Sequence, residues 1–126
     1  MIESGLYQYL VNTLAGAGGR VYHGPLPSKT QLPAVSFSRS DTDDTLTFDE
    51  GQTDFVGAHM QIDCWGADIG AAAVLCAQLH IALKNFRGYL GDAFVHGVFR
   101  EAMGDFYEQD VPGYRRSATY LFWHRE

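Results

Sequence analysis

The feature that most narrows the possible fold is a change of hydrophobic period at residue 66. Residues 58–64 alternate, and Gly66 then breaks the extended pattern. Asp68 is a good helix N-cap, and residues 69–85 have the apolar spacing of an amphipathic helix. One face of the strand is predicted to carry Ala58, Met60, Ile62 and Cys64, and the other His59, Gln61, Asp63 and Trp65.

The flanking segments predict one more helix and several strands. Ile2, Leu6, Leu10 and Leu14 recur every four residues, which predicts a helix that ends in the glycines of 15–19. An extended segment at 20–23, a proline-rich loop at 24–33 and a strand from 34 follow. We expect further strands over 94–105 and from 114 to the C-terminus. The predicted fold is α+β, a mostly antiparallel sheet of about four strands with two helices packed on one face, in the order α-β-β-β-α-β-β.

The predicted sheet has apolar residues on both faces. In the last strand, Ala118, Tyr120 and Phe122 alternate with Leu121 and Trp123. Two helices can cover only one face of such a sheet, and monomers rarely expose a large contiguous apolar patch. We therefore expect another copy of the chain to cover the second face. The residues predicted to take part in this self-association are Phe55, Trp65, Leu121 and Trp123.

His59 and Cys64 lie in the same predicted strand. Alternation directs their side chains to opposite faces of the sheet, so they cannot act as a catalytic pair. Cys64, Cys76 and His80 make a conceivable zinc set, although it lacks the paired spacings of structural zinc sites. Buried core residues are the simpler interpretation, and we expect no catalytic residue, cofactor or metal. The alternative is a small α+β dimer that binds a ligand or a metal through these three residues.

The negative net charge of the chain argues against a protein that binds nucleic acid through its phosphates. The 126-residue chain has a net charge of −6, and six of its fifteen acidic residues lie in 41–54. That segment is typical of a solvated loop or a hairpin tip, and its spacing does not fit a calcium-binding loop. We predict that it binds a partner through Asp41, Asp43, Asp44, Leu46, Phe48, Asp49, Glu50 and Asp54. Two cysteines and the lack of a signal peptide or a long apolar run favour synthesis in a reducing cytoplasm and no membrane association.

The order of these segments resembles one known family over nearly the whole chain. The segments are RVYHGPLP, LPAVSFS, HMQIDCWGADIGAAAVLCAQLHIAL and the closing YRRSATYLFW. Together they resemble the tail-completion, or tail-terminator, proteins of long-tailed bacteriophages and gene transfer agents. The most specific part is the strand that ends at Trp65, followed at once by a helix of small residues.

The resemblance implies a single tail-terminator-like domain over 1–126 that is a virion structural protein and not an enzyme. It implies a ring, usually a hexamer, that caps the tail tube, stops its elongation and joins it to the head connector. The implied partners are further copies of the chain, the tail tube protein and the connector protein. DNA would pass through the ring without tight binding, and the protein, made in the host cytoplasm, would lie at the tail end near the neck.

Overall fold

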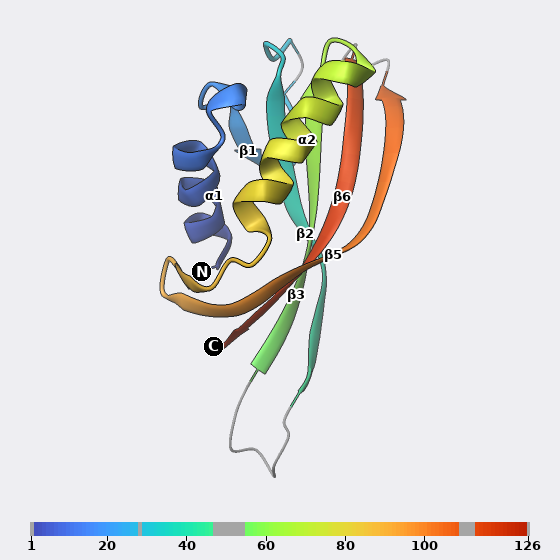
Figure 1. Cartoon of the computed structure of the whole chain (residues 1–126). Helices are drawn as coiled ribbons and strands as arrows, with labels where there is room; N and C mark the ends of the chain where they lie inside the picture. The colour runs from blue at the N-terminus through green and yellow to red at the C-terminus, as the bar shows by residue number, and fades with distance from the viewer. Residues whose placement is uncertain (1, 28, 47–54, 109–112, 126) are drawn as a thin grey trace.

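The computed structural model describes residues 2–27, 29–46, 55–108 and 113–125, in which six strands form one sheet (Figure 1). The chain begins with helix α1 (Ile2–Thr13) and a 3-10 turn, η1 (Ala15–Ala17). Then come β1 (Val21–His23), β2 (Ala34–Leu46), β3 (Phe55–Gly66), helix α2 (Ile69–Leu83), β4 (Gly88–Leu90), β5 (Ala93–Glu108) and β6 (Gly113–Arg125). Across the sheet the strands lie in the order β1-β2-β3-β6-β5-β4.

The predicted sheet of about four mostly antiparallel strands, in the order α-β-β-β-α-β-β, is wrong. The sheet has six strands and is mixed, because the loop at 24–33 carries the chain back and β2 runs parallel to β1. The segment at 88–90, which is not among the predicted strands, is strand β4. It forms a tight hairpin with β5 in which Leu90 pairs with Ala93, and Gly91 between them has φ 64°.

The change of period at residue 66 is confirmed. Ala58, Met60, Ile62 and Cys64 are fully buried on the side of β3 that faces the helices. The Asp68 carboxylate accepts a hydrogen bond of 2.7 Å from the backbone N–H of Ala71, which satisfies one of the free donors of the first turn of α2. The helix then ends at Leu83, two residues earlier than expected.

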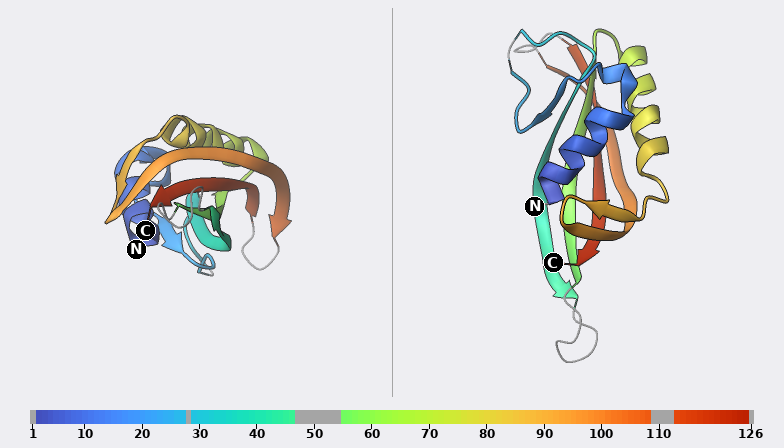
Figure 2. Two further views of the ribbon diagram at one scale, coloured as in Figure 1. Left: turned by 90° about the horizontal axis from the view of Figure 1, so that it is seen from below. Right: turned by 90° about the vertical axis from the view of Figure 1, so that its left-hand side faces the viewer.

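Both helices lie against the inner side of a curled sheet (Figure 2). Helix α2 packs on the central strands β3 and β6, whereas α1 packs against β1 and β4, the two outermost strands. The predicted stripe Ile2, Leu6, Leu10 and Leu14 is buried in this core. Because α1 reaches both margins of the sheet, the sheet must curl around it, which leaves the opposite side of the strands uncovered by helices.

Candidate assembly surface

We call the side of the sheet that faces away from α1 and α2 the outer face. One row across it joins His59 of β3, Leu121 of β6 and Phe99 of β5, and the next row places Trp123 between Gly57 and Gly97. Leu121 and Trp123 are partly exposed, and Phe99 is 56% exposed. Glycine on both neighbouring strands leaves the Trp123 indole without flanking side chains in its row. The outer face therefore holds an apolar group of Phe99, Leu121 and Trp123.

The chain itself covers Trp65, another residue predicted to take part in self-association. The Trp65 side chain is 6% exposed and belongs to a small second core, in which it packs with Leu26 and Ala34. Its indole N–H donates a hydrogen bond of 2.9 Å to the Ser36 hydroxyl. The loop at 24–33 thus closes over this end of the outer face. Phe55 lies at the first position of β3, where its backbone pairs with Leu46 and Arg125.

The middle of the outer face is polar. The Arg115 guanidinium lies 3.3 Å from the Asp63 carboxylate, and His59 Nδ1 lies 2.7 Å from Glu101 Oε1. His59 and Asp63 of the same strand thus contact different partners and not each other. The Arg115 guanidinium also lies 4.5 Å from the centre of the Phe106 ring, which is 49% exposed. The polar pairs therefore separate two apolar areas of the outer face.

Among the described residues, strand β5 carries most of the large exposed aromatic side chains, and these were not predicted from the sequence. Its large exposed apolar side chains are Phe99, Met103, Phe106 and Tyr107. Tyr107 is opposite Tyr114 of β6, with ring centres 5.0 Å apart. The sequence did contain a sign of this surface, because the apolar residues of the strand do not alternate regularly between its two faces. Such a strand is typical of a surface that contacts a partner.

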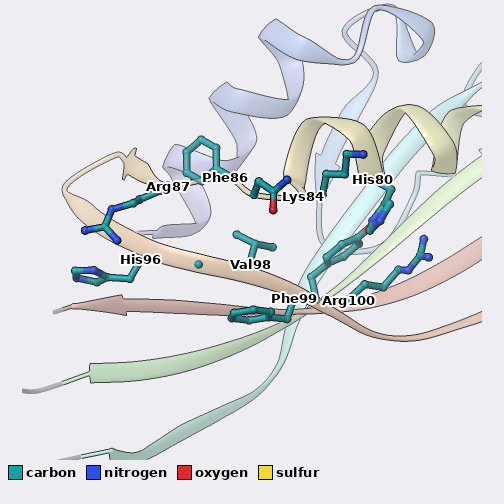
Figure 3. Close-up of a pocket in the computed structure, with 11 residues that line it drawn as sticks. His80, Lys84, Phe86, Arg87, His96, Val98, Phe99 and Arg100 are labelled. Atoms are coloured by element: carbon teal, nitrogen blue, oxygen red, sulfur yellow. The ribbon is translucent and has the colours of Figure 1, made fainter.

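A pocket of about 560 Å³ lies between the end of α2 and the first half of β5 (Figure 3). Its lining includes Lys84, Arg87, Arg100, His80 and His96, and none of its lining residues is acidic. Burial lowers the pKa of His80 below its usual value, and the positive charges of Arg100 and Lys84 lower that pKa further. The pocket is therefore an electropositive site on an acidic protein.

We expect the protein to lose folding stability at alkaline pH because of Tyr120, which lines this pocket. His80 Nδ1 lies 3.2 Å from the Tyr120 hydroxyl, and burial raises the pKa of Tyr120 from 10.0 to about 12. Between pH 10 and pH 12 the unfolded chain releases this proton while the folded chain keeps it, so stability falls as pH rises. We expect Tyr120 to account for a loss of about 2 to 3 kcal/mol by pH 12. Urea unfolding from pH 9 to 12 should show a shallower decline in Tyr120→Phe than in the wild type, whereas an unchanged slope would contradict this assignment.

The three residues of the alternative metal site do not come together as a set. Cys64 and Cys76 are buried neighbours, and hydrogen bonding to Cys76 together with burial raises the pKa of the Cys64 thiol. The Cys76 thiol lies 3.9 Å from the Met103 sulfur, whereas His80 is directed to Tyr120. Among the described residues, no three His, Cys, Asp or Glu side chains form a group that could hold a metal ion. The two thiols act here as small core residues.

The described part of the acidic segment, residues 41–46, lies in the β2–β3 hairpin and extends away from the helices (Figure 1). Asp41, Asp43, Asp44 and Leu46 belong to β2, and their strand pairs with β3 as far as Leu46 opposite Phe55. Part of the expected loop is therefore strand. The remaining predicted partner-binding residues lie outside the described residues: Phe48, Asp49, Glu50 and Asp54. No helix in the described part of the chain is long and apolar enough to span a membrane.

The sequence matches one protein family, and the fold matches that of a solved structure. The model of the family described as tail completion protein gp17 matches residues 6–125. A chain of a solved structure described as the virion of a native gene transfer agent particle superposes with a TM-score of 0.81 at 16% sequence identity. That match covers 100% of this chain and 95% of the other, and at this identity it shows a shared fold. No curated protein matches the sequence.

Proposed function

Because the chain belongs to the tail completion protein gp17 family, we propose that it works by assembly, as a structural part of a phage-type tail, and not by catalysis. The match over residues 6–125 is the observation that carries this proposal, and it confirms the resemblance noted in the sequence. The fold shared with a chain of a gene transfer agent particle supports a place in the virion.

In this role, copies of the chain form a ring that caps the finished tail tube. The ring, which we propose to be a hexamer, stops elongation of the tube and joins it to the head connector. The apolar group of Phe99, Leu121 and Trp123 supports this role, because an exposed apolar surface of this kind needs a neighbour. The net charge of −6 suits a ring through which DNA passes without tight binding.

The acidic residues that follow β2 in the sequence are proposed to make a separate contact. We propose that residues 47–54, which include Asp49 and Glu50, bind the tail tube or the connector. Replacing Asp49 with Asn and Glu50 with Gln should leave stability within about 0.5 kcal/mol of the wild type, because the sequence predicts a solvated segment, in which charges contribute little. Ring formation should persist, while attachment to tubes weakens and depends on salt. Cosedimentation with purified tubes measures this attachment, and unimpaired attachment would exclude residues 47–54 from the interface.

Electron microscopy of the purified protein, alone and mixed with growing tail tubes, tests the proposed function. We expect six-fold rings with a central hole, seen at tube ends, and tubes that stop lengthening once the protein is added. Tubes that keep growing at the same rate, with no protein at their ends, would contradict the terminator role.

A further inference from the structure

At each edge of the sheet, a long stretch of strand is hydrogen-bonded to a neighbouring strand on one side only. Strand β1 pairs with β2 only at Val35–Phe37, and β4 pairs with β5 only at Ala93–Val95. Within the described residues, 38–46 of β2 and 96–108 of β5 therefore have no second neighbouring strand. Rows of backbone N–H and C=O groups left open in this way are templates for a strand from another chain.

The part of the open β5 margin at residues 96–100 is electropositive, whereas 101–108 carries Glu101, Asp105 and Glu108. The pocket of about 560 Å³ is lined by residues 96–100 of this strand and by the end of α2. Lys84, Arg87 and Arg100 border it, which is three of the nine lysine and arginine residues of the chain (Figure 3). A strand added beside residues 96–100 would lie along this pocket, so the charge of the margin favours an acidic strand.

The open margin of β2 has the opposite charge. Residues 38–46 contain Asp41, Asp43 and Asp44, and Arg39 is the one basic residue among them. Arg39 is already 3.0 Å from the Glu3 carboxylate of α1 in the same chain. The stretch thus offers a net negative strand of nine residues, while at the other edge of the sheet residues 96–100 border the basic side chains Lys84, Arg87 and Arg100.

We infer that residues 38–46 of β2 in one copy pair with the open margin of β5 in the next copy, beside Lys84, Arg87 and Arg100. This inference rests on the proposed ring and names the junction between its subunits. Strands β2, β3, β6 and β5 are antiparallel in turn, so β2 and β5 run in opposite directions. Copies related by rotation about an axis along the strands keep these directions, so the new pair is antiparallel, the more stable arrangement.

The charges of the two margins also favour this junction over a contact between two identical margins. Pairing two β5 margins would bring together the cationic groups of two copies, and pairing two β2 margins would bring together their aspartates. Pairing β5 with β2 joins unlike charges. It also uses two different surfaces, which is the condition for a closed ring of more than two copies, whereas a self-complementary contact stops at a dimer.

Charge exchange tests the junction. Lys84→Glu with Arg87→Glu should weaken subunit association at least about tenfold, and Asp43→Lys with Asp44→Lys should do the same. Combining all four changes in one chain should restore association to within about threefold of the wild type. Analytical ultracentrifugation over a concentration series, together with electron microscopy at tube ends, gives these values. Lys29→Glu, a charge reversal at an exposed lysine remote from the pocket, is the control and should assemble normally.

Cross-linking gives an independent test that needs no charge change. One protein carries Ser38→Cys or Ser40→Cys, and another carries Phe99→Cys or Ala102→Cys. Under mild oxidation by copper phenanthroline, covalent dimers should form when the two proteins are mixed and not within either protein alone. The native Cys64 and Cys76 are buried, so the wild type is the blank. Dimers within the β5 variants or within the β2 variants would show pairing of like margins and overturn the inference.

These experiments distinguish a failure of the proposed junction from a failure of the proposed function. Wild-type protein that neither forms rings nor caps tubes would refute the proposed function. Rings that survive both charge reversals and give no mixed cross-link would refute the junction and leave the function intact. If either charge variant fails to fold, as judged by circular dichroism, the cross-linking result alone decides.

Discussion

Replacing Gly5 with alanine should lower the free energy of unfolding by about 2 to 4 kcal/mol. A methyl group on Gly5 would collide with the backbone of Gly91 and Leu90 in the β4–β5 turn, lying 2.6 Å from the Leu90 carbonyl oxygen. Alanine favours a helix by about 1 kcal/mol over glycine, but this gain is smaller than the cost of moving α1 away from β4. Urea unfolding followed by tryptophan fluorescence measures the difference.

Gly70→Ala is the matched control, because it makes the same exchange in the first turn of α2. The nearest atom to its new methyl would be the Asp68 carboxylate oxygen, at 3.3 Å, and that side chain can adjust. We expect a change in unfolding free energy of less than about 1 kcal/mol. If Gly5→Ala is as stable as the wild type, α1 does not lie this close to the β4–β5 turn.

Trp123→Asp should weaken assembly at least about 30-fold and leave the monomer folded, because tryptophans at the centre of interfaces carry about 2 kcal/mol or more of binding energy. Trp123 is partly exposed on the outer face, between Gly57 and Gly97. A carboxylate there would have to be desolvated when a neighbour covers this surface. Ring counts at tube ends and sedimentation measure assembly, and circular dichroism measures folding.

Thr119→Asp adds the same charge to the same strand and the same face, but in the polar middle, where Thr119 is opposite Gln61 and Ala102. This control should assemble almost normally. An unfolded Trp123→Asp protein would mean that Trp123 belongs to the core of the monomer. Normal assembly by that variant would exclude this part of the outer face from the interface.

Local patterns were enough to predict β3 and α2 because local chemistry determines both. Alternation from Ala58 to Cys64 assigns the buried face, and the carboxylate of Asp68 fixes the helix start. The same reasoning placed Leu121 and Trp123 on the outer face. Strand β4 could not be predicted from three residues in a glycine-rich segment, because its pairing with β5 and its contact with α1 are tertiary.

The exposed surface of β5 was missed for a different reason. The pairing of β5 with β6 shifts between Val95 and Gly97 and again between Arg100 and Ala102. Each such irregularity inserts one residue and reverses which face the following side chains occupy. Simple alternation therefore assigns Phe99 incorrectly. The burial of Trp65 could not be predicted either, because Leu26, which covers it, comes from a loop about forty residues upstream that carries no periodic signal.

The position of α1 between β1 and β4 has a consequence during synthesis on the ribosome. Helix α1 is made first, yet β4 consists of residues 88–90. At roughly 5 to 20 residues per second, about 4 to 15 s pass between the two. During that interval Ile2, Leu6 and Leu10 cannot complete their burial, because β4 does not yet exist. A nascent chain that stalls before residue 88 would therefore leave the apolar face of α1 partly exposed to chaperones until the β4–β5 hairpin is made.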